Sequence, residues 1–190
     1  MNSDRTKTSQ ENMPLDFAPD DFLQTLFSVS KAVLLSPGLF FHGMKRTGGL
    51  RNPTIYLASC VLVHALIVGL LVKDERLLAL NLLFGMVLPF VTAGILFYIL
   101  TNLFKASGTY EAAFRVNAYA SAVALLSWMP VIGVLLEFYR LYLICVGLSA
   151  AFGIKIPRAL LAVLLTIFVY AIASLALFQV TGGQWPRAVS

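Results

Sequence analysis

The residue pair most able to do chemistry lies within Gly108 to Ala122, GTYEAAFRVNAYASA, at the start of a long apolar segment. Glu111 and Arg115 are four residues apart, so on a helix they share a face and can form an ion pair. Glu111 would lie in the first helical turn, where the helix dipole favours an anion. The pair is either a juxtamembrane ion pair that orients this helix or a functional site that faces a cavity, because ionisable groups at membrane depth are costly unless they are used or paired.

Further polar residues follow the pair along the chain. Small residues flank Asn117 and Ser121 at helical spacing, so a second helix could approach closely and hydrogen-bond to them. Gly147 and Ala151 offer another close-approach face. His64, midway along the first apolar segment, is either a neutral imidazole bonded to a neighbouring helix or part of a proton relay. A polar path across the membrane could be lined by Glu111, Arg115, Asn117, Tyr119 and His64.

A second group of charges follows two helix-breaking residues, Pro130 and Gly133. Glu137 and Arg140 bracket Tyr139, and we interpret this stretch as a tight connection between two apolar segments. It is either an ordinary solvated turn, which we favour, or a polar re-entrant turn that lines a pathway. Tyr139 and Arg140 are therefore further candidates for binding.

Familiar catalytic and metal-binding signatures are absent from the sequence. It contains no Walker loop, no GxSxG, no HExxH and no Cys/His cluster. Cys60 and Cys145 both lie in apolar runs, where isolated thiols behave as small hydrophobes. We therefore predict no catalytic residues, no metal and no cofactor, and a protein that is not an enzyme.

Composition places the chain in a membrane. Hydrophobic residues make up 59% of it, charged residues only 12%, and the mean hydropathy is +0.84, well above the values of soluble domains. The net charge of +5 indicates contact with anionic lipid headgroups and a fixed topology rather than nucleic-acid binding. The partners predicted on this basis are membrane lipids.

The apolar segments predict an all-α, polytopic membrane protein with about five transmembrane helices, preceded by interfacial amphipathic helices. Residues 1–18 read as a disordered polar tail, 19–53 as the interfacial helices, 54–180 as the transmembrane domain and 181–190 as a polar C-terminal tail. Pro89 is expected to kink the second segment. The five segments are Thr54–Val72, Leu77–Phe104, Gly108 to about Leu136, about Phe138 to Gly153, and Ala159–Val180.

Basic residues favour a cytoplasmic N-terminus and an external C-terminus, because Lys and Arg in short loops stay on the cytoplasmic side. Five crossings put ten basic residues on the N-terminal side and four on the other. The four are Lys73, Arg76, Arg140 and Arg187.

Three stretches resemble a known family: SPGLFFHGM with a proline just before the first span, GTYEAAFRVNAYASA, and WMPVIGVLLEFYRLYLICVGL. Over roughly Leu34 to Phe178 the chain resembles the bacterial branch of the Yip family, the Ypt/Rab-interacting proteins. The resemblance implies a five-helix membrane domain with a cytoplasmic N-terminus, in the bacterial inner membrane. Eukaryotic members are linked with Rab GTPases and membrane shaping, but they carry a longer acidic or aromatic N-terminal region than this chain.

Two functions are compatible with these observations. The first is a non-enzymatic membrane protein that organises lipid or partner proteins, as a homo-oligomer or with other membrane proteins. The second is a small transporter or channel with a polar path near Glu111, Arg115, Asn117 and His64.

Overall fold

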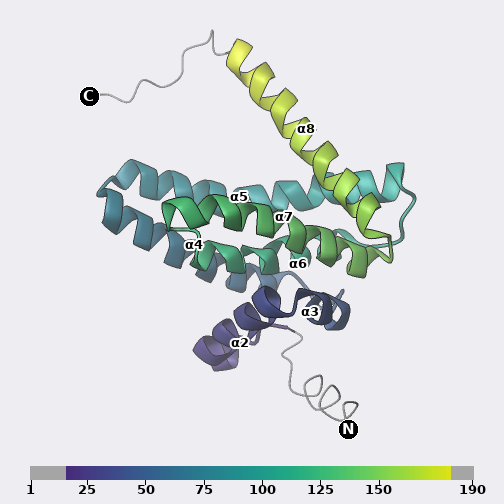
Figure 1. Ribbon diagram of the computed structural model, residues 1–190, viewed down its shortest axis with the longest axis horizontal. Coiled ribbons are helices and arrows are strands. Elements are labelled where there is room, and N and C mark those ends of the chain that lie inside the picture. The colour runs from purple at the N-terminus through teal and green to yellow at the C-terminus, as the bar shows by residue number, and fades with distance from the viewer. Residues whose placement is uncertain (1–15, 181–190) are drawn as a thin grey trace.

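The computed structural model describes residues 16–180, and within this range every regular element is a helix (Figure 1). The all-α prediction is confirmed. In chain order the elements are the 3-10 turn η1 (Pro19–Asp21), α2 (Phe22–Leu35), α3 (Pro37–Gly43), α4 (Arg51–Val72), α5 (Glu75–Tyr98), the π-helical turn η2 (Ile99–Leu103), α6 (Tyr110–Ala120), the 3-10 turn η3 (Ser121–Leu125), α7 (Pro130–Phe152) and α8 (Ile156–Val180).

Four of these helices are long and apolar enough to cross a bilayer. The helices α2 and α3 together pass the same test as one unit bent by 118°, which makes up to five candidate spans. Only 17–33% of each long span is buried inside the protein, so most of its Leu, Val and Phe side chains face outward. This surface suits lipid rather than water, and the protein is an integral membrane protein. The four spans are Arg51–Val72, Glu75–Leu103, Ile132–Phe152 and Ile156–Gln179.

A tight hairpin joins α4 to α5. Lys73 ends α4 in a left-handed conformation with φ of 55°, and Asp74 begins the next helix as its N-cap. The Asp74 carboxylate accepts hydrogen bonds from the backbone N–H groups of Arg76 and Leu77 at 2.9 and 3.2 Å. These caps satisfy backbone groups at both helix ends and make α4 and α5 antiparallel neighbours.

The helix α6 forms the centre of the bundle. Every residue from Ala112 to Val123 is buried, and α6 packs against α4, α5 and α7. Small residues make this possible, because five of these twelve positions are alanine and the neighbouring helices can approach closely. Thr109 caps the helix by accepting the Ala112 N–H at 3.1 Å.

The predicted boundary between the third and fourth apolar segments is wrong. The third was expected to run to about Leu136, but the helix ends at Leu125 and α7 begins at Pro130, the first-turn position that proline favours. Residues 137–140 therefore lie inside α7 and not in a turn. Glu137 and Arg140 form an i,i+3 ion pair within the helix, so these charges are accommodated without a loop.

Around this bundle, α2 and α3 lie on one side and α8 leaves it on the other (Figure 1). The starts of α4 and α6 and the end of α7 lie together at one end of the bundle, which we call the Arg115 end. The α4–α5 turn at Lys73 lies at the opposite end, which we call the hairpin end. Both ends of the α2–α3 pair are held at the Arg115 end, as described next.

Candidate functional site

Arg115 is the largest fully buried side chain in the described structure, and three acceptors surround its guanidinium. Its Nε donates to Glu111 Oε1 at 3.0 Å, one turn earlier on α6. Its Nη1 donates to Asp16 Oδ2 at 3.1 Å, and its Nη2 donates to the Gly49 carbonyl at 2.9 Å. Arg115 thereby joins α6 to the residues before α2 and to the loop after α3.

The loop at Gly48 and Gly49 is shaped to receive this guanidinium. Both residues have positive φ, +132° and +89°, a region in which glycine is favoured. A Cβ on Gly48 would lie 3.2 Å from Arg115 Nη2. The Gly49 N–H donates to Glu111 Oε1 at 2.7 Å, so this loop gives one hydrogen bond to the ion pair and accepts another.

Tyr119 completes the site from the next turn of α6. Its hydroxyl donates to Asp16 Oδ1 and accepts the Phe17 N–H at 3.2 Å. The fully buried Phe17 ring makes edge contacts with Phe22 and with Tyr56. We call Asp16, Gly49, Glu111, Arg115 and Tyr119 the Arg115 cluster.

The cluster binds chain segments together and offers no nucleophile or metal site. Its two carboxylates share one guanidinium, and the donors and acceptors are used on one another. Within residues 16–180 no group of three or more His, Cys, Asp or Glu side chains could hold a metal ion. Asp16 was missed by sequence reasoning, which assigned 1–18 to a tail. Residues 1–15 of that tail lie outside the described range.

Asn117 lies apart from the Arg115 cluster. It is buried, and its side-chain amide donates to the Ala113 carbonyl of its own helix at 2.9 Å rather than to another helix. It lines a cavity of about 240 Å³ among α5, α6, α7 and α8, together with Arg140 and Tyr170.

His64 lies at a second cavity, of about 180 Å³, among α4, α5, η3 and α7. Its Nδ1 is 3.0 Å from the Ala124 carbonyl and 3.3 Å from Ser127 Oγ. The first distance fits an imidazole that donates to a neighbouring backbone. Asn81 and Glu137 also line this cavity.

The residues from 137 to 140 point to different neighbours. Tyr139 donates its hydroxyl to the Leu34 carbonyl near the end of α2 at 2.6 Å, so it binds α2 to α7. Arg140 Nη1 lies 3.6 Å from Glu137 Oε2, and both residues line both of the cavities just described. Because it lies within α7, Arg140 no longer belongs to the charge count of the outer loops.

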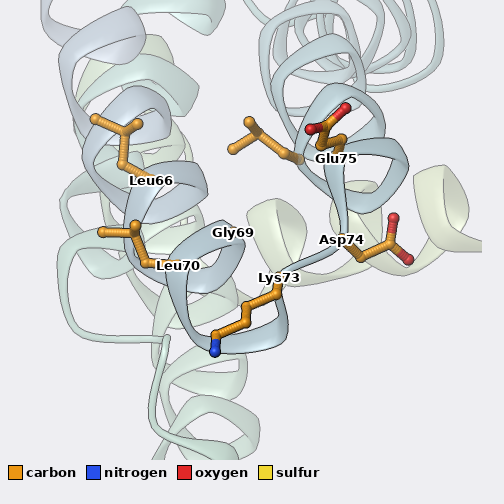
Figure 2. A pocket seen from close by; sticks show the side chains of 7 residues that line it. Leu66, Gly69, Leu70, Lys73, Asp74 and Glu75 are labelled. Carbon is orange, nitrogen blue, oxygen red and sulfur yellow. The ribbon is translucent and has the colours of Figure 1, made fainter.

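A third, wider depression of about 400 Å³ lies at the hairpin end. Its apolar floor is formed by Leu66, Leu70 and neighbouring residues, with charged side chains at the rim (Figure 2). In this view the Lys73 side chain points away from Asp74 and Glu75. The depression is the exposed groove of a helix hairpin, and its charges do not converge on a point.

Two of the residues predicted for helix packing, Gly147 and Gly133, lie at close contacts. A Cβ on Gly147 would be 2.5 Å from Val116 Cγ1, so α7 approaches α6 closely there. A Cβ on Gly133 would be 2.6 Å from the Ser127 carbonyl, in the connection that precedes Pro130. Ala151 is buried on α7. Pro89 is buried inside α5, which continues through it to Tyr98.

Comparison with known families decides the relationship. The sequence profile of the Yip1 domain matches residues 31–178, most of the chain. The chain belongs to the Yip1 domain family. No curated protein and no solved structure gives a significant match.

The limits of the Yip1 domain divide the Arg115 cluster unequally. Gly49, Glu111, Arg115 and Tyr119 all lie within the matched range, but Asp16 and the first half of α2 precede it. The Yip1 domain therefore supplies the guanidinium, and a segment before it supplies one of the two carboxylates.

Proposed function

We propose that this protein is a non-enzymatic membrane protein that organises lipid by holding α2 and α3 as a wedge in one leaflet. The observation that carries the proposal is the Arg115 cluster. Asp16 precedes α2 and Gly49 follows α3, and both bind the same guanidinium. The chain of α2 and α3 therefore leaves the Arg115 end of the bundle and returns to it, as a re-entrant unit does.

Contacts along α7 support partial insertion. The Leu34 carbonyl near the end of α2 accepts from Tyr139, thirteen residues before the end of α7, or about 20 Å along the helix. On the return path, Phe41 of α3 lies beside Gly147, and Arg46 donates to the Ala150 carbonyl at 2.9 Å. The bend between α2 and α3 thus lies deeper than its two ends, at about the middle of a hydrocarbon core roughly 30 Å thick.

The outer surface of this pair is apolar. One face of α2 packs on the bundle, whereas Leu23, Phe27 and Leu35 are 66–71% exposed and Leu39 of α3 is also exposed. These side chains suit acyl chains and not water. A volume added to one leaflet alone expands that leaflet, so the wedge favours curved membrane.

Curvature sorting tests the proposal. Fluorescently labelled protein in giant vesicles should concentrate in thin tubes pulled from the surface, relative to the flat membrane. The double variant Leu23→Gln/Phe27→Gln should lose most of this enrichment, because polar side chains weaken insertion. The matched control Leu23→Met/Phe27→Leu keeps the apolar surface and should behave as the unaltered protein. Equal enrichment of the Gln variant and the control would exclude α2 as the source.

Association is the second part of the proposal. We infer that the protein assembles with itself or with other membrane proteins, since its long helices leave most of their surface outside the fold. Mass measurement of the protein released from lipid nanodiscs should give more than one copy per particle. A strictly monomeric species, with no partner retained, would contradict this part.

The location follows from charge and resemblance. We propose the inner membrane of a bacterium, with the N-terminus in the cytoplasm and the C-terminus outside, and with α6 and η3 as a fifth crossing between the spans α5 and α7. The support is the excess of basic residues at the Arg115 end, among them Lys45, Arg46, Lys105 and Lys155, and the resemblance to bacterial Yip proteins.

The alternative, a transporter or channel lined by Glu111 and Arg115, is less well supported. Those side chains bind each other and the Gly49 loop, and they line none of the three cavities described above. His64 and Asn117 do line cavities, and both of these cavities meet at Arg140.

A further inference from the structure

Glu137 and Arg140 place two charges deep within a membrane span. Arg140 lies twelve residues before the end of α7, about 18 Å along the helix, within the candidate span Ile132–Phe152. Charged side chains at this depth are rare and mark binding sites or pathways more often than ordinary structure. This pair therefore calls for an explanation other than packing.

The pair leaves much of its bonding capacity unused. Its N–O distance is 3.6 Å, long for an ion pair, and the Glu137 side chain is 58% exposed. The Arg140 Nε–H is buried and has no acceptor among the described residues. A guanidinium offers five N–H donors, so Arg140 can still bind another anionic group.

The two cavities that share this pair place a row of polar side chains within a mainly apolar lining, and we call this row the strip. Both are lined by Leu88, Glu137 and Arg140, so they meet at the charged pair. Along α5 their polar lining extends from Asn81 to Thr92, about 16 Å of helix. The other polar lining residues are Asn117, Thr166 and Tyr170 in the cavity of about 240 Å³ and His64, Ser121 and Ser127 in the cavity of about 180 Å³.

Apolar residues at the edge of the strip open it to the surrounding lipid. Phe84, Leu88 and Ile167 line the cavities, yet each is 42–52% exposed on the outer surface of the helices. A ligand whose polar part lies in the strip can therefore leave its apolar part among acyl chains. An amphiphile fits this arrangement better than a free ion.

We propose that the strip is a groove that admits the headgroup of a zwitterionic phospholipid and lets the lipid pass between leaflets. The lipid phosphate binds Arg140 and the ammonium binds Glu137, while the neutral side chains replace water around the headgroup. The opposite charges of the pair match the opposite charges of the ligand, and the acyl chains remain in the bilayer. This activity is separate from the wedge, because α2 and α3 line neither cavity.

The test is lipid exchange in vesicles. Protein is reconstituted into phosphatidylcholine vesicles with a trace of phosphatidylcholine that carries a fluorescent label on one acyl chain, so that the headgroup stays zwitterionic, and dithionite quenches the outer leaflet. Protein-free vesicles should lose about half of the signal, and vesicles with the protein nearly all of it. Arg140→Gln and Glu137→Gln should each slow the second phase at least tenfold. Lys155→Gln, on an exposed turn, is the matched control and should not.

Two further measurements keep the result interpretable. Circular dichroism and gel filtration establish that each variant folds, and the charge-exchanged double variant Glu137→Arg/Arg140→Glu should recover part of the rate because a zwitterion can bind in reverse. Native mass spectrometry should show retained phosphatidylethanolamine that Arg140→Gln loses. Exchange no faster than in protein-free vesicles, or folded single variants with full rate, would overturn the proposal. Uptake of free phosphoethanolamine without lipid exchange would instead show a small-solute pathway and would also overturn it.

Discussion

Removing the Arg115 guanidinium is the sharpest test of the cluster that holds the α2–α3 pair. In Arg115→Gln the carboxylates of Asp16 and Glu111, only 13% and 23% exposed, lose their shared counter-ion. Breaking a buried pair by removing one partner costs about 3–5 kcal/mol. Because both carboxylates keep some contact with solvent, we expect the lower part of this range, about 3 kcal/mol of unfolding free energy.

The partner variants should cost less, and in a defined order. Asp16→Asn removes a charge but keeps an oxygen for Tyr119, so about 1.5–2 kcal/mol is expected for its weakened bond to Arg115. Glu111→Gln retains an acceptor for both Arg115 and the Gly49 N–H and should cost about 1 kcal/mol. Arg115→Gln combined with Asp16→Asn should be milder than the sum, because Asp16 is then no longer left charged without its counter-ion.

Reversible unfolding in mixed micelles with increasing denaturing detergent measures these differences. Arg158→Gln, an exposed arginine at the start of α8, is the matched control and should change stability by less than about 0.5 kcal/mol. A loss of less than about 1 kcal/mol of unfolding free energy for Arg115→Gln would mean that its ion pairs behave as solvated surface salt bridges. The Arg115 cluster would then not hold α2 and α3 in place.

Two other predictions concern the same end of the molecule. Gly48→Ala should lower the free energy of unfolding by about 1–3 kcal/mol, because alanine is strained at φ +132° and its Cβ would crowd Arg115. Gly38→Ala is the control, since a Cβ there meets open space. Equal melting temperatures for the two variants would contradict the expected strain. Single cysteines at Ser9 and Glu75 should react with impermeant reagents from opposite faces of the membrane, with the Ser9 position on the cytoplasmic face; labelling of both from one face would overturn the topology.

The membrane class and most helices could be predicted from the sequence because they depend on local composition. Long apolar runs with charged or proline-containing gaps predict α4, α5 and α8 to within a few residues. The ion pair between Glu111 and Arg115 was also accessible, since it depends only on i,i+4 spacing.

The rest depended on contacts that local patterns do not encode. Asp16 lies 99 residues from Arg115, and nothing in a polar N-terminal stretch distinguishes it from the other acidic residues there. The Glu137–Arg140 stretch was misread because charges after a proline and a glycine resemble a turn, whereas cavities in the folded bundle accommodate them inside a helix. These surroundings depend on how the five helices α4 to α8 are arranged around the pair.

The order in which the chain is made gives the Arg115 cluster a further consequence. Gly49 is synthesised 66 residues before the arginine that binds it, so α2 and α3 emerge well before they can be fastened. They must wait until α4 and α5 have inserted and α6 has followed. A chain that stalls or misinserts either helix never presents Arg115 at the right place. The helices α2 and α3 can therefore be held by the Arg115 cluster only after α4, α5 and α6 are in place. Products that are truncated before Arg115 lack this attachment.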